Sequence, residues 1–332
     1  MNVHAIDRRF FLASVAAGGF LASFPGEAAL GNDLDFPSFL AGVRQEALQA
    51  GIRARTLDVA LGGLQPLPRV LELDKKQPEK TLTFAEYIQR VVPQARIDTA
   101  RRKLQENQLL LDDISRRFGV QPRFIVALWG IETDFGQRMG TFPIIPALAT
   151  LAYDGRRSAF FRKELMNALT IVDQGHVTPD AMIGSWAGAM GQNQFMPSSF
   201  LAYAYDWDGD GRRDIWGSRP DALASIANYL SKVGWKGNET WGREVKAPAR
   251  LDAALVGLDT RKSIAAWNAL GVRRVDGGEL PARDLEASLV QPGGAEGPTL
   301  MVYDNYRTVM KWNKSLYFAS AVGFLADGLD ER

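Results

Sequence analysis

The fold of this chain is decided by the stretch Gln121-Pro-Arg-Phe-Ile-Val-Ala-Leu-Trp-Gly-Ile-Glu-Thr-Asp-Phe-Gly136. A proline near its start suits the first turn of a helix, because the N–H that proline lacks has no helical partner there. Residues 124–129 are all apolar, so the helix presents apolar side chains on every face. A helix of this kind lies in a protein core. The sequence therefore predicts a buried helix that ends before Gly136.

Glu132 falls in the last turn of the predicted helix, on the face that also holds Leu128 and Trp129. Apolar neighbours make ionisation costly, so we expect a raised pKa for this carboxyl and a proton available near neutral pH. A general acid needs such a proton. Alternatively, Glu132 is an exposed residue at a fraying helix end, and this segment alone does not separate the two interpretations. Asp134 follows two residues later, about 200° around a helix, so we do not expect it to act as a second carboxylate.

The composition excludes several classes of site. The chain has 332 residues, 46% of them apolar and 23% charged, which is typical of a soluble protein with two domains or one large domain carrying an insertion. A net charge of +1 gives no electrostatic signature of nucleic-acid binding. Cysteine is absent, and the two histidines are His4 and His176. Thiol chemistry is thereby excluded and a Ser-His-Asp triad or multi-histidine zinc site is disfavoured, so catalysis must use carboxylates or a hard metal ion.

Residues 1–30 have the features of an export signal. Arg8 and Arg9 precede an apolar run from 10 to 24, and small residues follow around Ala29. The run is shorter than the about 20 apolar residues that a membrane helix needs, and the order Arg-Arg-Phe-Phe-Leu resembles a twin-arginine signal. No cysteine is available for lipid attachment, so we expect a periplasmic protein that is not membrane-anchored. The alternative is a buried N-terminal helix.

The remaining chain predicts a mainly α (α+β) protein. Residues 31–244 form a predicted helical region, 245–302 a small β-containing subdomain, and 303–332 C-terminal helices that rejoin the core. Strands are expected at Leu285–Val290 and Thr299–Tyr303. Helices are expected at 36–50, 54–61, 84–91, 97–118, 146–153, 158–173, 222–233, 262–270, 306–313 and 315–325, with 97–118 as one long helix.

A second informative stretch is Gly184-Ser-Trp-Ala-Gly-Ala-Met-Gly-Gln-Asn-Gln-Phe-Met-Pro-Ser-Ser-Phe200. Its glycines allow close approach of the backbone to a partner. Ser185, Gln192, Asn193 and Gln194 add neutral hydrogen-bonding groups beside aromatic rings. This combination suits a sugar, which offers hydroxyls and apolar ring faces. A tight helix–helix crossing explains the same pattern equally well.

An acidic stretch, Asp206-Trp-Asp-Gly-Asp-Gly-Arg-Arg-Asp-Ile-Trp216, matches the start of an EF-hand calcium loop. Carboxylates stand at relative positions 1, 3, 5 and 9, glycine at 6, and position 7 would supply a backbone carbonyl. Position 12 departs from the pattern because it is Gly217, so an acid in the next helix is expected to close the site. The candidate ligands are Asp206, Asp208, Asp210, Arg212 and Asp221. A solvated Asp/Gly turn without an ion is the alternative.

Together these segments, with Asn228-Tyr229, resemble the lytic murein transglycosylase B family, also called family 3 lytic transglycosylases or glycoside hydrolase family 103. The resemblance covers essentially the whole chain after residue 30. It implies a lysozyme-like helical catalytic core of the goose type, additional helices and a small β part. It also implies cleavage of the β-1,4 bond between N-acetylmuramic acid and N-acetylglucosamine in peptidoglycan, leaving a 1,6-anhydro-muramic acid end. The expected partner is the peptidoglycan glycan strand, acted on by a monomer with a structural calcium and no organic cofactor.

The resemblance also assigns site residues. Glu132 takes the position of the single catalytic acid/base. Glycan-binding positions fall on Tyr87, Ser185, Gln194, Tyr229 and Asn313. The acidic stretch takes the place of the family's calcium loop, which also ends on an aspartate after the tryptophan, in support of Asp221 as a ligand.

A single carboxylate is enough for this reaction. A glycoside hydrolase uses two carboxylates, one on either side of the bond. A lytic transglycosylase attacks with the C6 hydroxyl of the same sugar, so intramolecular proximity replaces an activated water. Two other classes stay open on the sequence: a hydrolytic muramidase or chitinase-like glycosidase, and a non-catalytic, calcium-dependent cell-wall-binding protein.

Overall fold

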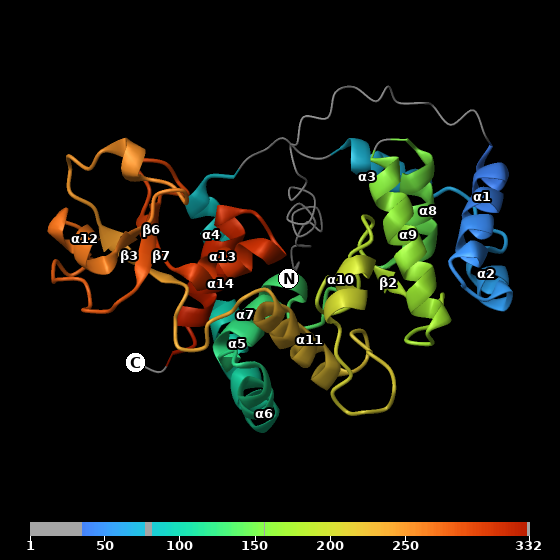
Figure 1. Cartoon of the computed structure of the whole chain (residues 1–332), viewed down its shortest axis with the longest axis horizontal. Coiled ribbons are helices and arrows are strands. Elements are labelled where there is room, and N and C mark those ends of the chain that lie inside the picture. Colours follow the sequence, from blue (N-terminus) through green and yellow to red (C-terminus); the bar gives the residue numbers. More distant parts are fainter. Residues whose placement is uncertain (1–34, 77–81, 156, 331–332) are drawn as a thin grey trace, which may run out of the picture. The chain divides into compact units, whose positions relative to one another are not determined.

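The structure is a computed structural model that describes residues 35–76, 82–155 and 157–330 (Figure 1). The predicted export signal lies outside these ranges, so the twin-arginine assignment stays a prediction. The chain folds into two compact units. The first unit takes the described residues up to 79 and Glu132–Tyr229, and the second takes Lys80–Ile131 and Leu230–Arg332.

The first unit is built around helix α8, whose residues from Ile144 to Ala152 are buried with the exception of Pro146. Helix α9 packs along α8, and α1, α2 and α10 pack against α9 (Figure 1). Asp35 starts α1 by accepting a 2.8 Å hydrogen bond from the N–H of Ser38. The helices of this unit are α1 (Phe36–Gln49), α2 (Ala54–Leu61), α3 (Pro68–Lys75), α8 (Ile144–Tyr153), α9 (Ser158–Asp173), α10 (Pro197–Tyr203) and most of α11 (Arg219–Lys232). A two-stranded antiparallel ribbon joins β1 (Phe142–Pro143) to β2 (Ile183–Gly184).

The second unit combines helices with a five-stranded antiparallel sheet in the order β4-β6-β7-β3-β5, which is drawn in orange beside α12 in Figure 1. The sheet has its own core, in which the fully buried Trp267 and Met301 pack with Leu289. The strands are β3 (Gly242–Lys246), β4 (Lys262–Ser263), β5 (Arg273–Arg274), β6 (Glu286–Val290) and β7 (Thr299–Val302). The helices are α4 (Phe84–Val91), α5 (Gln94–Glu106), α6 (Gln108–Phe118), α12 (Ile264–Ala269), α13 (Asp304–Trp312) and α14 (Leu316–Asp327), with a 3-10 turn η1 (Ala253–Leu255).

Helix α7 (Pro122–Thr133) is the buried helix predicted from the opening stretch. Its apolar residues between Phe124 and Ile131 are at most 6% exposed, which confirms the all-round apolar pattern. All of α7 belongs to the second unit except Glu132 and Thr133, which belong to the first.

Several expectations are corrected by the structure. The single long helix at 97–118 is wrong: α5 and α6 are separate, and the break falls at Asn107, whose side chain bonds the carbonyl of Lys103 at 2.7 Å. Asparagine competes in this way for backbone groups and interrupts helices. Helices α3 and α10 were not expected, and the strand-rich part begins at Gly242 rather than at 245. The predicted class, mainly helical with a small sheet, is confirmed. Within the described ranges, no helix combines the length and apolarity needed to cross a membrane.

Candidate active site

Glu132 stands where the buried helix α7 reaches the surface. Leu128 and Trp129 are 0% and 3% exposed, whereas Glu132 itself is partly exposed. The carboxylate therefore has buried apolar residues one turn before it, without being enclosed itself.

The chain leaves α7 through a strained turn. Asp134, Phe135 and Gly136 have φ angles of 53°, 61° and 83°, a left-handed conformation that is rare for residues other than glycine. Asp134 is thus no longer helical, and the helical rotation of about 200° that we used to exclude it as a second carboxylate does not apply. Its carboxylate lies 3.4 Å from Nε of Arg138. Strain of this kind is typical of functional sites.

Thr133 holds this turn and connects it to a distant part of the chain. Its Oγ1 accepts a 3.1 Å hydrogen bond from the N–H of Gly136 and donates one of 2.8 Å to the carbonyl of Gln192. Neither the Thr133 hydroxyl nor the Gln192 backbone was predicted as a site component. The only signal was their position inside the two motifs.

The glycine-rich loop, defined here as residues 184–196, follows β2 and folds back on itself. Ser185 and Ala189 exchange two hydrogen bonds, one of them from the N–H of Ala189 to Oγ of Ser185 at 3.0 Å. Trp186, Met190 and Phe195 are 5%, 0% and 3% exposed. These side chains therefore pack the loop against the unit and do not present an open surface for stacking on a sugar. The segment is a loop between β2 and α10, so the expected helix–helix crossing is not found there.

The predicted glycan-binding residues of the first unit lie on or beside this loop. Ser185 is 1% exposed, so its hydroxyl lies inside the loop. Gln194 has a φ of 50° and donates from Nε2 to the carbonyls of Met139 and Gly191, both at 3.0 Å. Tyr229, on α11, lies 5.9 Å from Phe195 between ring centroids, and burial raises the pKa of its hydroxyl well above the ordinary value.

The other two predicted glycan-binding residues belong to the second unit. Tyr87 is partly exposed on α4, and its ring lies 5.4 Å from that of Tyr317 on α14. Asn313 ends α13, and its Oδ1 accepts a 3.0 Å bond from the N–H of Ser315. Both residues therefore lie near the start of α14.

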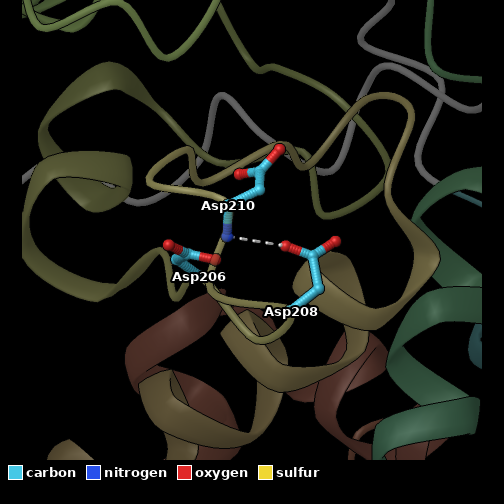
Figure 2. A group of neighbouring side chains, drawn as sticks. All are labelled: Asp206, Asp208 and Asp210. Carbon is cyan, nitrogen blue, oxygen red and sulfur yellow. Dashed lines mark hydrogen bonds between the residues drawn. The ribbon is translucent and has the colours of Figure 1, made fainter.

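The acidic loop, defined here as residues 206–217, brings three carboxylates together. Asp206, Asp208 and Asp210 each place one oxygen within 4.8 Å of the others, and the N–H of Asp210 donates to Asp208 (Figure 2). Asp206 accepts from the N–H groups of Gly209 and Gly211 at 2.8 and 2.9 Å. The side chain of Arg212 binds Asp210 at 2.9 Å, and the bonds that Asp210 accepts from Arg212 lower the pKa of that exposed carboxyl.

Asp221 clamps the two ends of the acidic loop. It is 1% exposed in the first turn of α11, and it accepts from the N–H of Trp207 and from that of Asp214, both at 2.8 Å. Burial raises the pKa of its carboxyl, against the lowering effect of these two bonds. Asp221 is not part of the group of three clustered carboxylates. The structure thus gives it a clamping role that the sequence did not suggest.

Comparison with known proteins places this chain in a family. Residues 35–327 match the family described as the transglycosylase SLT domain. The chain is 35% identical over 212 residues to the membrane-bound lytic murein transglycosylase B of Escherichia coli K12. That alignment covers 62% of this chain and 56% of the relative, so it spans little more than half of the relative's length.

Solved structures give the same result over more of the chain. SltB3 from Pseudomonas aeruginosa, in complex with NAG-anhNAM-pentapeptide, is 44% identical with a TM-score of 0.87, covering 89% of this chain and 79% of that one. The Escherichia coli lytic transglycosylase Slt35, in complex with calcium, is 28% identical with a TM-score of 0.75, covering 88% and 92%. These matches confirm the lysozyme-like lytic transglycosylase fold. The chain belongs to the transglycosylase SLT domain family.

Proposed function

We propose that this protein is a peptidoglycan lytic transglycosylase. It cleaves the β-1,4 bond between N-acetylmuramic acid and N-acetylglucosamine and leaves a 1,6-anhydro-muramic acid end. The observation that supports this most is the family match over residues 35–327 together with Glu132 at the end of the buried helix α7. The SltB3 complex, which holds an anhydro-muramic acid fragment, supports the same chemistry for a relative that is 44% identical.

In the proposed reaction, Glu132 acts first as an acid and then as a base. Its carboxyl protonates the glycosidic oxygen as the bond to C1 breaks. The resulting carboxylate takes the proton of the C6 hydroxyl, whose oxygen bonds to C1 of the same sugar. Held within one molecule, that hydroxyl has a high effective concentration, so no second carboxylate is needed to activate water.

We propose that Ser185, Gln194 and Tyr229 bind the glycan strand, and that Tyr87 and Asn313 are further glycan-binding residues. Tyr87 is partly exposed and can offer a ring face and a hydroxyl. Ser185 and Gln194 already bond the backbone of their own loop. Their proposed contribution includes keeping that loop in the shape that accepts the sugar.

Product analysis in heavy-oxygen water tests the reaction. Purified sacculi are digested, and the released muropeptides are measured by mass spectrometry. A lytic transglycosylase gives anhydro ends, one water lighter than the hydrolytic product and free of heavy oxygen. Hydrolysis gives ends that contain the heavy isotope, and its predominance would replace this proposal by a muramidase. The Glu132→Gln variant controls for contaminating enzymes.

We also propose one structural calcium ion in the acidic loop. The donor set fits: three carboxylates cluster within 4.8 Å, and hard oxygen ligands are those that calcium prefers. Asp206, Asp208 and Asp210 would hold the ion with the carbonyl of Arg212, and Asp221 contributes as the buried acid that clamps the loop. A bound ion would neutralise the mutual repulsion of these carboxylates. The calcium complex of Slt35 supports the proposal.

For the cell, we propose a monomer in the periplasm, exported by the twin-arginine-like signal at residues 1–30. The basis is the order Arg8-Arg9 before an apolar run. Replacing both arginines by lysine should leave the precursor in the cytoplasm. Continued secretion of that form would indicate the general secretory route, and light scattering of the purified protein measures the oligomeric state.

A further inference from the structure

We propose that Thr133 and Gln192 are positioning residues, which hold the Glu132 carboxylate in place for proton transfer. The inference deepens the proposed function and depends on it for its kinetic test. The starting observation is that Thr133 is fully buried and directly follows Glu132 in the chain. Its hydroxyl makes the two hydrogen bonds to Gly136 and Gln192 described above, one as acceptor and one as donor.

Gln192 is in turn fixed to the acidic loop. Its N–H donates to the carbonyl of Ile215 at 2.9 Å, and Nε2 of its side chain donates to the carbonyl of Trp216 at 3.2 Å. Gln192 is 7% exposed. Its Oε1 lies so close to Gly136 that a Cβ atom on residue 136 would be only 2.7 Å from this oxygen. Gln192 therefore touches the strained turn on one side and the acidic loop on the other.

The strained turn explains why such a connection is needed. Two non-glycine residues in succession, Asp134 and Phe135, are held at positive φ directly after the helix end. Such conformations are energetically costly and persist only where surrounding contacts enforce them. If the Thr133 and Gln192 bonds are removed, the turn can relax, and the last turn of α7, which carries Glu132, is then free to shift.

Hydrogen bonds between protein groups also hold Trp216, the residue at which this connection reaches the acidic loop. Asp214 accepts from the N–H of Trp216 at 2.9 Å, and the Asp214 N–H is held by Asp221. The connection from Trp216 through Gln192 to Thr133 therefore runs through hydrogen bonds between protein groups. Of the candidate calcium ligands, only Asp221 supports it, through the N–H of Asp214.

Two substitutions at one position test the proposal. Thr133→Val keeps the shape but removes the hydroxyl, whereas Thr133→Ser keeps the hydroxyl. We expect kcat on a soluble glycan fragment to fall about tenfold to a hundredfold in the valine variant, the scale of a small misplacement of a catalytic group, with KM unchanged. The serine variant should stay close to wild type.

Thr150→Val is the matched control for loss of a buried hydroxyl. Thr150 is also fully buried, and its Oγ1 likewise donates to a carbonyl, that of Pro146, and accepts from an N–H, that of Leu67. Its loss should lower the melting temperature without lowering kcat at a temperature where the protein is folded. Equal kcat losses in Thr150→Val and Thr133→Val, or wild-type kcat in folded Thr133→Val, would overturn the proposal.

A double-mutant cycle adds a second readout. Gln192→Met keeps the length of the side chain but removes its amide. Thr133→Val removes the bond to the Gln192 carbonyl, and Gln192→Met removes the next bond of the same connection, from the Gln192 side chain to Trp216. The effects of the two substitutions on kcat should therefore be less than additive when they are combined. Full additivity would contradict the proposal.

Crystal structures of the Thr133→Val and Thr133→Ser variants separate this inference from the proposed reaction. We expect altered φ angles at residues 134–136 and a displaced Glu132 in the valine variant alone. An unchanged turn and an unmoved Glu132 in that variant overturn the positioning role, whatever the wild-type reaction is. Absence of anhydro products from the wild type, with the displacement present, overturns the proposed function alone.

Discussion

The buried carboxylate of Glu164 accepts two hydrogen bonds from Ser198, one from the N–H at 2.8 Å and one from the hydroxyl at 2.7 Å. Glu164 lies on α9, 3% exposed, and Ser198 stands in the first turn of α10. The carboxylate thus gives a hydrogen-bond partner to a backbone N–H in the first turn of α10, which directly follows the glycine-rich loop. The position of this loop's end is therefore set by a charged group in the core of the first unit.

Glu164→Leu should destabilise the protein, because it leaves the two Ser198 donors without their partner. We expect the free energy of unfolding, measured by urea denaturation, to fall by about 1–3 kcal/mol. Glu164→Gln keeps an acceptor oxygen and is the control, with a smaller loss. Equal stability of the leucine and glutamine variants would show that the two bonds contribute little.

Glu132→Gln should abolish most of the activity, since the amide keeps size and hydrogen bonding but is not an acid that can protonate the glycosidic oxygen. We expect release of muropeptides from sacculi to fall by at least about a hundredfold, with the thermal unfolding curve unchanged. Asp134→Asn is the matched control: asparagine tolerates positive φ, so the turn is kept while the second nearby carboxylate is lost. Near-normal turnover in Glu132→Gln, or an equal loss in Asp134→Asn, would contradict the assignment of Glu132 as the single catalytic acid/base.

The sequence predicted the parts of this site that depend on local pattern. An apolar stretch on every helix face predicted the buried α7, and the spacing of Asp206, Asp208 and Asp210 predicted a cluster of carboxylates. The connection between Thr133 and Gln192 could not be predicted, because 59 residues separate them and any hydroxyl can find many partners. The break at Asn107 was missed for the opposite reason: a competing side-chain bond to the helix backbone overrides a good helical pattern.

Stability should decrease as the pH is lowered through the range in which His176 titrates. This residue is 8% exposed and accepts at Nδ1 from the N–H of Arg213 at 3.2 Å. Burial, with the nearby charge of Arg213, lowers the pKa of His176 below its ordinary value of 6.5. The unfolded chain therefore binds more protons at mildly acidic pH, so the free energy of unfolding falls as the pH drops through 6.5 towards the lower folded pKa. An ion bound beside Asp206 would lower that pKa further and keep the direction.

The measurement is the urea midpoint between about pH 7.5 and about pH 5.5, where carboxylates of ordinary pKa titrate little. His176→Gln is the control, because glutamine can accept from Arg213 without titrating. In the described part of the chain His176 is the only histidine, so the variant should show a flatter pH dependence. The same slope in both proteins would assign the effect to other groups.

Calcium should raise the melting temperature, because an ion that binds only the folded acidic loop stabilises the folded state by mass action. Chelation should clearly lower the melting temperature. It should lower the initial rate at moderate temperature only slightly. The reason is that Asp214 and Asp221 hold the Trp216 end of the loop, next to Gln192, through backbone N–H groups. Differential scanning calorimetry with calcium and with chelator measures the first effect, and product release measures the second.

Asp210→Ala should abolish the calcium-dependent part of this stability, since it removes one of three clustered carboxylates. Asp112→Ala, which removes an exposed acid on α6, should leave the calcium dependence unchanged. If the wild type melts at the same temperature with calcium and with chelator, the acidic loop is a turn held by hydrogen bonds between protein groups alone. If chelation instead stops the reaction while the protein stays folded, the ion contributes to the site through Gln192 and Thr133, and the protein bonds at Trp216 are not sufficient to hold Glu132.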